Sequence, residues 1–127
     1  MYEYPAKCVK VVDGDTVKLE VDIGFGITKK DTFRLKDIDT PEIYRPSCDA
    51  ELQHGREAKQ FVQDQLRCWI KDDDRAAILL VHTHKDKQGK FGRYLCDIYY
   101  KTDDGLKSLV EELKRNGFEK RESYVEN

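Results

Sequence analysis

The chain has 127 residues, of which 23 are basic and 25 are acidic, so its formal charge is −2. This length predicts a single domain over residues 1–127. A composition that is 39% hydrophobic and 38% charged favours a packed core beneath a very soluble surface and argues against disorder. The slight acidity argues against a nucleic-acid binder that relies on overall positive charge, although residues 29–36 and 85–93 each carry four basic residues and one acidic residue.

The sequence given predicts neither a membrane anchor nor a secretory signal. Its longest apolar run, from Ala76 to Val81, has six residues, too few to span a bilayer. The start Met-Tyr-Glu-Tyr-Pro has no basic region followed by an apolar region. We therefore expect a cytoplasmic protein without membrane partners, in which the cysteines (Cys8, Cys48, Cys68 and Cys96) are reduced and mostly buried.

Hydrophobic periodicity predicts three strands, a helix, two strands and a second helix. The expected elements are a hairpin around Asp13-Gly14, a strand over Thr32–Ile38, a loop over Asp39–His54 and then a helix that carries Ala58, Phe61, Val62, Leu66 and Trp69. A turn at Asp72–Asp74, strands over Ala76–His84 and Tyr94–Tyr100, and a helix that carries Leu106, Leu109, Val110 and Leu113 before a Gly117 cap complete the series. This order predicts a mainly β, α+β fold: a five-stranded OB-type Greek-key barrel with two helices.

Two acidic segments are the first candidates for a functional site. Asp13-Gly14-Asp15-Thr16 is typical of a hairpin turn, and Asp37-Ile38-Asp39-Thr40-Pro41-Glu42 could be a solvated strand end. On one barrel, however, carboxylates crowded at strand ends repel one another unless a cation lies between them. A hard divalent cation such as Ca²⁺ would satisfy that need with oxygen ligands.

Two arginines supply the opposite charge. Arg34 precedes the second acidic segment, and Arg93 lies in Lys90-Phe91-Gly92-Arg93. Each could form only a surface ion pair, but arginine also binds phosphate with two parallel hydrogen bonds. A metal held by carboxylates, two arginines and one further carboxylate are the groups that phosphodiester hydrolysis requires.

These motifs resemble those of the staphylococcal nuclease (thermonuclease-like) family in order and approximate spacing. The resemblance rests on Val12-Asp13-Gly14-Asp15-Thr16-Val17, Phe33-Arg34-Leu35, Asp39-Thr40-Pro41-Glu42 and Gly92-Arg93-Tyr94-Leu95. It implies an OB-type barrel that cleaves DNA or RNA with Ca²⁺ and leaves 3′-phosphate ends. It further implies that Asp15, Asp39 and the Thr40 carbonyl bind Ca²⁺, that Arg34 and Arg93 hold the scissile phosphate, and that Glu42 activates or orients water.

The resemblance also implies substrate contacts, with departures from the family pattern. Lys90 and Phe91 are expected beside the nucleotide, although Phe91 stands where the family commonly has tyrosine. Near the C-terminus the family often has two tyrosines that contact the base and the phosphate, and only Tyr124 can be placed as one of them. Relatives continue into a third helix after this point, so we expect the surface it covers to be polar, covered by the second helix and tail, or covered by a second copy of the chain.

The remaining candidates and alternatives are weaker. His82 and His84 could share a transition metal, but packing roles are the simpler interpretation, and His54 at the helix entrance is expected to cap or lie on the surface. A nucleic-acid-binding barrel without turnover is the alternative function, and a structural or protein-interaction barrel is a third. The joint presence of Asp15, Arg34, Asp39, Glu42 and Arg93 favours the enzyme, because a module that only binds needs no water activator.

Overall fold

The structure is a computed structural model that describes residues 2–68, 78–88 and 94–124. The strands are β1 (Tyr2–Asp13), β2 (Thr16–Gly24), β3 (Ile27–Leu35), β4 (Leu79–Gln88), β5 (Tyr94–Thr102) and β6 (Gly105–Ser108), and the helices are α1 (Asp49–Leu66) and α2 (Leu109–Arg115). None of the described helices is long and apolar enough to cross a membrane.

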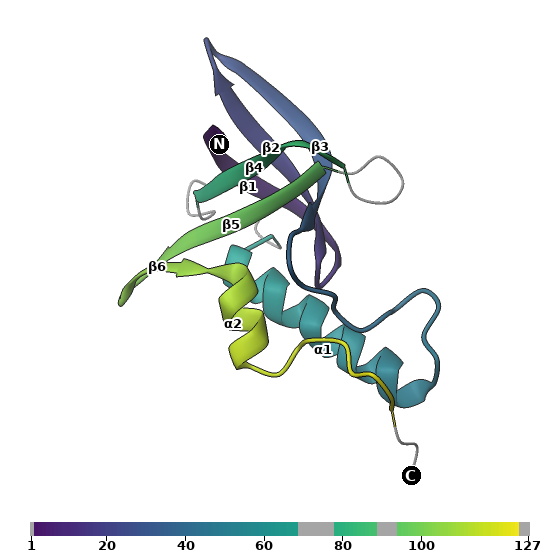
Figure 1. Ribbon diagram of the computed structural model, residues 1–127. Helices are drawn as coiled ribbons and strands as arrows, with labels where there is room; N and C mark the ends of the chain where they lie inside the picture. The colour runs from purple at the N-terminus through teal and green to yellow at the C-terminus, as the bar shows by residue number, and fades with distance from the viewer. Residues whose placement is uncertain (1, 69–77, 89–93, 125–127) are drawn as a thin grey trace.

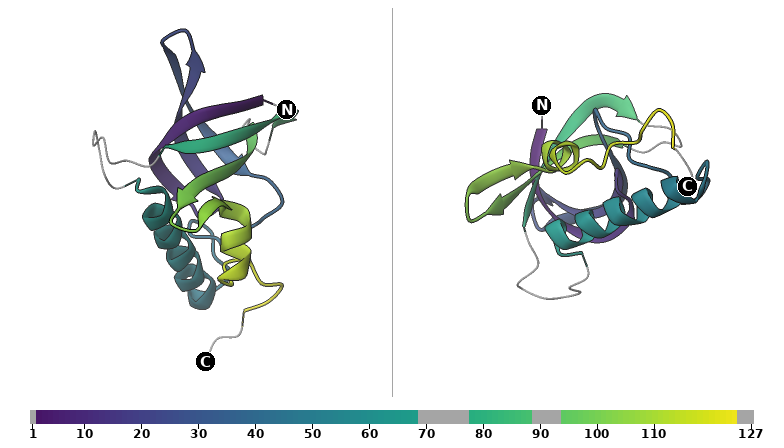
Figure 2. Two further views of the ribbon diagram at one scale, coloured as in Figure 1. Left: turned by 90° about the vertical axis from the view of Figure 1, so that its left-hand side faces the viewer. Right: turned by 90° about the horizontal axis from the view of Figure 1, so that it is seen from below.

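Five strands close into a barrel (Figure 1). The antiparallel order β3-β2-β1-β4-β5 is closed by a parallel pairing of β3 with β5, in which Phe33, Arg34 and Leu35 oppose Tyr94, Leu95 and Cys96. Beyond this pairing β5 turns back into β6, which extends the sheet outside the ring. Seen from below in Figure 2, the strands encircle the core and α1 lies across one end. The predicted OB-type α+β barrel with two helices is confirmed.

The core fills the inside of the barrel and the space beneath α1. Alternate residues of each strand point inward, because successive side chains of a strand lie on opposite faces. On α1 the buried apolar positions follow the helical period. The largest fully buried apolar side chains are Val11, Val17, Leu19, Leu35, Val62, Leu66, Leu79, Val81, Ile98, Leu109 and Leu113.

A disulfide joins Cys8 of β1 to Cys68, just after α1, with the two Cα atoms 5.1 Å apart. The expectation of reduced thiols is therefore wrong for this pair. The two cysteines are 60 residues apart in sequence and meet only because α1 packs against β1. Cys48 and Cys96 are free, and burial raises the pKa of the Cys96 thiol.

Three helix boundaries differ from the expectation. The first helix was expected to extend to Trp69, but it ends at Leu66. The first helix begins at Asp49, within the segment predicted to be a loop up to His54. The second begins at Leu109 rather than near Leu106, because Gly105, at φ 109°, makes the turn into β6. The expected turn at Asp72–Asp74 lies outside the described residues.

Residues 117–124, here called the C-terminal strap, run back along α1 after α2 ends (Figure 1). Gly117, at φ 77°, makes the reversal. Phe118 then packs on Phe61 and His54, with ring centroids 5.1 and 6.1 Å apart. Within the residues the structure describes, no helix follows α2, and the strap covers part of α1 instead.

Candidate active site

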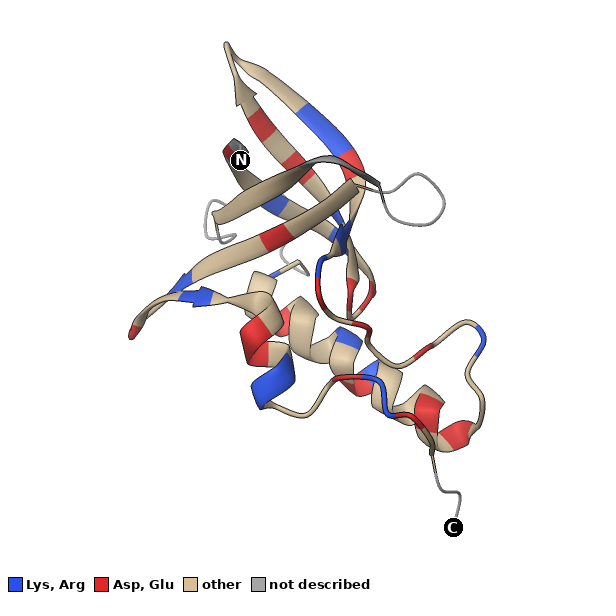
Figure 3. Ribbon diagram, viewed as in Figure 1, with Lys and Arg blue, Asp and Glu red and all other residues tan. Residues whose placement is uncertain are grey.

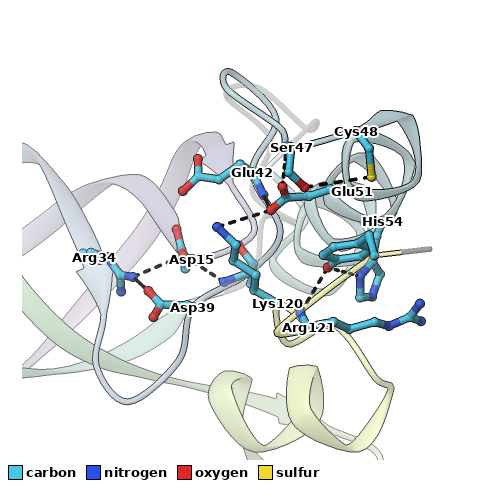
Figure 4. A network of polar contacts seen from close by, with 12 residues as sticks. Asp15, Arg34, Asp39, Glu42, Ser47, Cys48, Glu51, His54, Lys120 and Arg121 are labelled. Carbon is cyan, nitrogen blue, oxygen red and sulfur yellow. Dashed lines mark hydrogen bonds and ion pairs between the residues drawn. The ribbon is translucent and has the colours of Figure 1, made fainter. Parts of the chain in front are cut away.

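Asp15 and Asp39 meet at the guanidinium of Arg34 (Figure 4). Asp15 lies in the turn between β1 and β2, Arg34 lies near the end of β3, and Asp39 lies in the loop that follows β3. Arg34 Nη2 is 3.4 Å from Asp15 Oδ2 and donates a hydrogen bond to Asp39 Oδ1. Two carboxylates from separate segments therefore contact one nitrogen atom.

The backbone fixes the Arg34 side chain in this place. Its Nη1 donates to the carbonyl oxygens of Leu35 at 2.8 Å and Ile38 at 2.9 Å. These bonds leave Nη2 for the carboxylates. The chain reverses at Asp37, whose φ of 67° lies in the left-handed region, and this turn carries Asp39 back toward Arg34.

Asp15 is almost enclosed, with 9% of its surface exposed. Its Oδ1 accepts a hydrogen bond from Thr16 Oγ1, and its Oδ2 accepts one from Thr40 N, both at 3.0 Å. A Cβ on Gly14 would lie only 3.0 Å from Ala58 Cβ and from two side-chain atoms of Thr40. Glycine at this position therefore lets the turn that carries Asp15 pack tightly on α1 and on the loop after β3.

Glu42 is placed by its backbone and keeps an exposed side chain. Its N–H donates to Glu51 Oε2 at 3.1 Å. In Figure 4 its carboxylate extends away from Glu51, on the side of Asp15. On α1, Gly55 has no side chain to obstruct this loop: a Cβ there would lie 2.7 Å from Pro41 O and 3.1 Å from Glu42 O.

Glu51 is a buried carboxylate at the third position of α1, only 1% exposed. A glutamate at this helical position commonly reaches back to backbone N–H groups that precede the helix. Here it accepts from Ser47 N at 2.7 Å and Glu42 N at 3.1 Å and forms an ion pair with Lys120 Nζ at 3.4 Å. Burial alone would raise the pKa of Glu51, but the two backbone hydrogen bonds and Lys120 lower it to about 2.

A cavity of about 370 Å³ opens beside this cluster. It is lined by Arg34, Asp37, Ile38, Asp39, Glu119 and Lys120. The guanidinium and one of its carboxylate partners therefore face a space that a phosphate group could enter. The strap forms one wall of this cavity through Glu119 and Lys120.

The donor set fits a hard cation in its chemistry. In the described part of the chain, no group of three or more His, Cys, Asp or Glu residues is gathered like a formed metal centre. Two carboxylate oxygens nevertheless contact the same positively charged nitrogen of Arg34. Carboxylates that share one cationic partner can also share a metal ion, and Ca²⁺ takes its remaining ligands from carbonyl groups and water.

The other expected site residues are placed differently. Arg93, Lys90 and Phe91 lie outside the described residues. The Tyr124 hydroxyl forms a hydrogen bond with His54 Nδ1 at 2.8 Å and accepts a hydrogen bond from Arg121 N at 3.2 Å. This hydroxyl is therefore hydrogen-bonded to α1, and within the described part of the chain its polar partners are His54 and Arg121 rather than Asp15, Arg34 or Asp39.

The histidines each have a separate partner. His82 Nε2 pairs with Glu3 Oε2 at 2.6 Å, and His84 Nε2 pairs with Asp97 Oδ2 at 2.8 Å. The two imidazoles therefore contact different carboxylates, and this arrangement favours packing roles over a shared metal ion. His54 was expected to cap the helix or to lie on the surface, but it is buried, with 8% of its surface exposed. Its Nε2 forms a hydrogen bond with Gly117 O at 2.7 Å.

Comparison with known proteins identifies the group of proteins to which this arrangement belongs. A family model described as staphylococcal nuclease homologue matches residues 32–126, which include Arg34, Asp39 and Glu42. The chain belongs to the staphylococcal nuclease homologue family. The resemblance seen in the sequence motifs is thereby confirmed, and this family's fold agrees with the OB-type barrel observed here.

Two relatives match along 98% of this chain. The uncharacterized protein MJ1439 of Methanocaldococcus jannaschii is 32% identical over 139 residues. The thermonuclease of Staphylococcus hyicus is 25% identical over 125 residues. The chain spans 61% of the length of the archaeal protein and 63% of the length of the thermonuclease.

Charge on the described surface is mixed. Figure 3 shows Lys and Arg interspersed with Asp and Glu, including on the loop after β3 and on the strap. No single basic face is visible in this view, in agreement with the net charge of −2. Attraction of an anionic ligand would therefore depend on individual groups such as Arg34.

Sequence reasoning missed Glu51 and Lys120. Glu51 fell within a segment predicted to be a loop, so its place near the start of a helix was hidden. The sequence Cys48-Asp49-Ala50-Glu51 does place a glutamate three residues after the N-cap, a spacing typical of helix starts. No local pattern links Lys120 to Glu51, because they meet only through the strap.

Proposed function

We propose that this chain is a Ca²⁺-dependent nuclease that hydrolyses phosphodiester bonds of DNA or RNA. The observation that carries the proposal is the convergence of Asp15 and Asp39 on Arg34 beside an open cavity. Family membership and the match to a protein named thermonuclease support it. Because the chain spans less than two thirds of these relatives, the activity is proposed for this chain on the geometry of its own residues.

Asp15, Asp39 and the Thr40 carbonyl are the groups that would hold Ca²⁺. When bound, Ca²⁺ would polarise the phosphate and neutralise charge that develops on it. A hydrogen bond from Thr40 N to Asp15 Oδ2 at 3.0 Å joins two of these residues and supports the assignment. Asp39 is the more exposed of the two carboxylates, since 75% of its side chain is accessible to solvent, compared with 12% for Asp15.

Arg34 would bind the scissile phosphate and stabilise negative charge in the transition state. Its planar guanidinium suits two parallel hydrogen bonds to phosphate oxygens. In this structure Nη2 is engaged with carboxylates, so substrate binding requires that contact to be exchanged for phosphate. Arg93 would hold the same phosphate, with Lys90, Phe91 and Tyr124 as further substrate contacts proposed on the family resemblance.

Glu42 would orient or deprotonate the attacking water. Its carboxylate is exposed, and its side chain has no hydrogen-bond or ion-pair partner among the described residues. A free carboxylate near a metal-held phosphate is suited to accept a proton from water. Attack on phosphorus with departure of the 5′ oxygen would leave a 3′-phosphate end.

The test is cleavage of single-stranded DNA, duplex DNA and RNA by the purified chain, with Ca²⁺, with Mg²⁺ and with chelator. We expect cleavage with Ca²⁺, little with Mg²⁺, which favours stricter octahedral geometry, and none with chelator. A Glu42→Gln variant purified in the same way controls for contaminating nucleases, and Glu57→Gln on the exposed face of α1 is a matched charge control.

Three results would contradict parts of this proposal. Binding of nucleic acid without cleavage in Ca²⁺ would favour the barrel without turnover. Full activity with Mg²⁺ while Ca²⁺ is chelated would remove the calcium assignment. End-group analysis that finds 5′-phosphate products would overturn the assigned direction of bond cleavage.

A further inference from the structure

Glu51 and Lys120 lie behind the proposed catalytic loop, and neither has a place in the chemistry described above. Glu51 is 1% exposed, so its carboxylate cannot reach a bound polynucleotide. It contacts none of Asp15, Arg34 and Asp39 directly. Its partners are the backbone of Glu42, the backbone of Ser47 and the side chain of Lys120 (Figure 4).

Burying a carboxylate at this depth is costly unless its oxygens are bonded. Oε1 accepts from Ser47 N at 2.7 Å, and Oε2 accepts from Glu42 N at 3.1 Å and pairs with Lys120 Nζ at 3.4 Å. Both oxygens therefore have backbone donors that precede α1 in the chain. The carboxylate holds the segment from Glu42 to Ser47 against the first turn of the helix.

Lys120 connects the same helix to the other acidic residue of the site. Its backbone N–H donates to Asp39 O at 2.8 Å, while its Nζ pairs with Glu51. One residue of the strap thus contacts the backbone of Asp39 and the carboxylate that holds Glu42. Lys120 also lines the cavity beside Arg34, and 43% of its side chain is exposed.

The backbones of Asp39 and Glu42 are therefore each bonded to one member of a single ion pair. Between these two residues, the loop packs so closely on α1 that a Cβ at Gly55 would lie 2.7 Å from Pro41 O. The loop has little freedom to move away from the helix while the pair is intact. If the pair were broken, Glu51 would be a buried carboxylate without its cationic partner, and its support of the Glu42 backbone would weaken, while the Lys120 N–H bond to Asp39 O would remain.

We propose that Glu51 and Lys120 are positioning residues that hold the Asp39–Glu42 segment in the geometry the reaction requires. This proposal rests on the proposed nuclease function. Neither residue touches the reacting atoms in this role: Glu51 acts through the Glu42 backbone, and Lys120 acts through Glu51 and the Asp39 carbonyl. Supporting residues of this kind typically contribute about 10- to 100-fold to activity or metal affinity.

The chain offers a matched control on α2. Glu112 is also a buried helical glutamate, 8% exposed, and it pairs with Lys107 at 3.3 Å and with Arg115. Its partners belong to β6 and α2, so it bears no part of the proposed site. Glu112→Gln and Lys107→Gln therefore remove the same charges from a similar environment.

The experiment compares kcat, KM and melting temperature for Glu51→Gln, Lys120→Gln, Lys120→Arg and the two controls, in Ca²⁺ with a single-stranded DNA substrate. We expect Glu51→Gln and Lys120→Gln to lower kcat by about 10- to 100-fold with KM changed much less. Lys120→Arg, which keeps the charge, should recover most of the loss. The double variant should lose no more than the worse single variant, because both act through one pair.

Separate values of kcat and KM distinguish a positioning role from phosphate binding. The melting temperatures and the α2 controls distinguish it from general destabilisation. A rise in KM alone for Lys120→Gln would overturn the proposal, because that result makes Lys120 a substrate contact. Wild-type kcat in a folded Glu51→Gln would also overturn it, as would equal losses in the α2 controls. If Glu51→Gln does not fold, the partly exposed Lys120 variants still give the decisive comparison.

Hydrogen exchange distinguishes failure of this proposal from failure of the nuclease assignment. In Glu51→Gln the amides of Glu42 and Ser47 should exchange about tenfold faster or more, since a charged carboxylate is a stronger hydrogen-bond acceptor than the neutral amide oxygen that replaces it. This readout needs no activity. Unchanged exchange at both amides in Glu51→Gln would overturn the positioning role even if the wild type is an active nuclease. If exchange is faster in Glu51→Gln but the wild type is inactive, only the effect of this pair on catalysis is overturned.

Discussion

Asp15 and Thr40, 25 residues apart in sequence, are joined by a hydrogen bond of 3.0 Å from the Thr40 N–H to Asp15 Oδ2. The bond ties the turn between β1 and β2 to the loop after β3. Both residues are nearly fully buried, so this contact lies in a low-dielectric region where it is little weakened by water. The fold thus holds Asp15 and Thr40 against each other, whereas the side chain of Asp39 is 75% exposed.

Asp15→Asn should abolish tight Ca²⁺ binding while the chain stays folded. The change removes the negative charge of a proposed direct ligand and keeps the shape of the side chain. The loss of affinity measured by calorimetry should exceed the roughly 10- to 100-fold effect of a supporting residue. Asp64→Asn, on the exposed face of α1, is the control and should bind Ca²⁺ as the wild type does. Wild-type affinity in Asp15→Asn would remove Asp15 from the ligand set.

Arg34→Gln should separate metal binding from catalysis. Arg34 contacts both Asp15 and Asp39, so its positive charge competes with a cation for the same carboxylates. We expect the variant to bind Ca²⁺ at least as tightly as the wild type, yet to cleave about 100-fold more slowly or worse, because a transition-state contact is lost.

Calorimetry and single-turnover cleavage on the same preparation measure both quantities for Arg34→Gln. Weaker Ca²⁺ binding would show that Arg34 supports the metal site rather than competing with it. Unchanged turnover would remove Arg34 from the reaction.

Much of the barrel could be predicted from the sequence because its signals are local. The Asp13-Gly14 hairpin and the alternation of Val17, Leu19 and Val21 each follow from a few neighbouring residues. The start of α1 was predicted too late because Cys48 gives no side-chain cap and the first turn of the helix carries few apolar residues. Its N-terminal turn is held instead by Glu51, whose bonds to Ser47 and Glu42 no periodicity reveals.

The residue types of the candidate site could be predicted from the sequence, but the contacts between these residues could not. Motif order singled out Asp15, Arg34 and Asp39, and the barrel brings these three together. The Cys8–Cys68 disulfide and the Lys120–Glu51 pair join positions 60 or more residues apart, and only the packing of α1 and the strap decides them. Whether Arg93 completes the cluster stays a prediction, since it lies outside the described residues.

Removing the disulfide with Cys8→Ser and Cys68→Ser should destabilise the chain without removing its fold. A bond that closes a loop of 60 residues restricts the unfolded chain, and the loop-entropy relation gives about 4 kcal/mol for that length. Denaturant unfolding of the oxidised wild type, the reduced wild type and the double variant measures the difference. Cys48→Ser, at a free cysteine, is the control and should respond to reductant as the wild type does.

Reduced and oxidised wild type should therefore differ in midpoint, and the double variant should match the reduced protein. Identical midpoints for all three would show that Cys8 and Cys68 are not bonded in the folded chain. A midpoint shift that also occurred in the double variant on adding reductant would point to another cysteine.

Gly55→Ala should lower activity although it improves local helix propensity. Alanine in place of glycine inside an exposed helix gains about 1 kcal/mol. At this position, however, the new Cβ would lie 2.7 Å from Pro41 O, so the loop that carries Glu42 must move. We expect a reduced kcat and no gain in melting temperature. Gln53→Ala, on an exposed face of α1, is the helix control. Wild-type kcat together with a higher melting temperature would show that the loop shifts at no cost.

The free energy of unfolding should decrease as the pH falls, partly because of Glu51. The direction of this change follows from the lowered pKa of its carboxyl group. The folded chain holds the pKa of this carboxyl at about 2, below its ordinary value of 4.5, because backbone donors and Lys120 outweigh the effect of burial. The unfolded chain therefore binds the proton more readily than the folded chain between these values. The stabilisation by ionised Glu51 is complete above about pH 4.5 and is lost as the pH falls toward 2.

Glu51→Gln has no proton to bind at this position, so its unfolding free energy should depend less steeply on pH between 4.5 and 2. Urea unfolding at several pH values in this range measures the slope. Glu57→Gln, at an exposed glutamate on the same helix, controls for the loss of one negative charge. Glu112, whose pKa is also lowered, contributes its own slope in every one of these proteins and cancels from the comparison. Parallel slopes for Glu51→Gln and the wild type would mean that the folded chain does not lower the pKa of Glu51, so that its hydrogen bonds and its ion pair with Lys120 do not stabilise the ionised form.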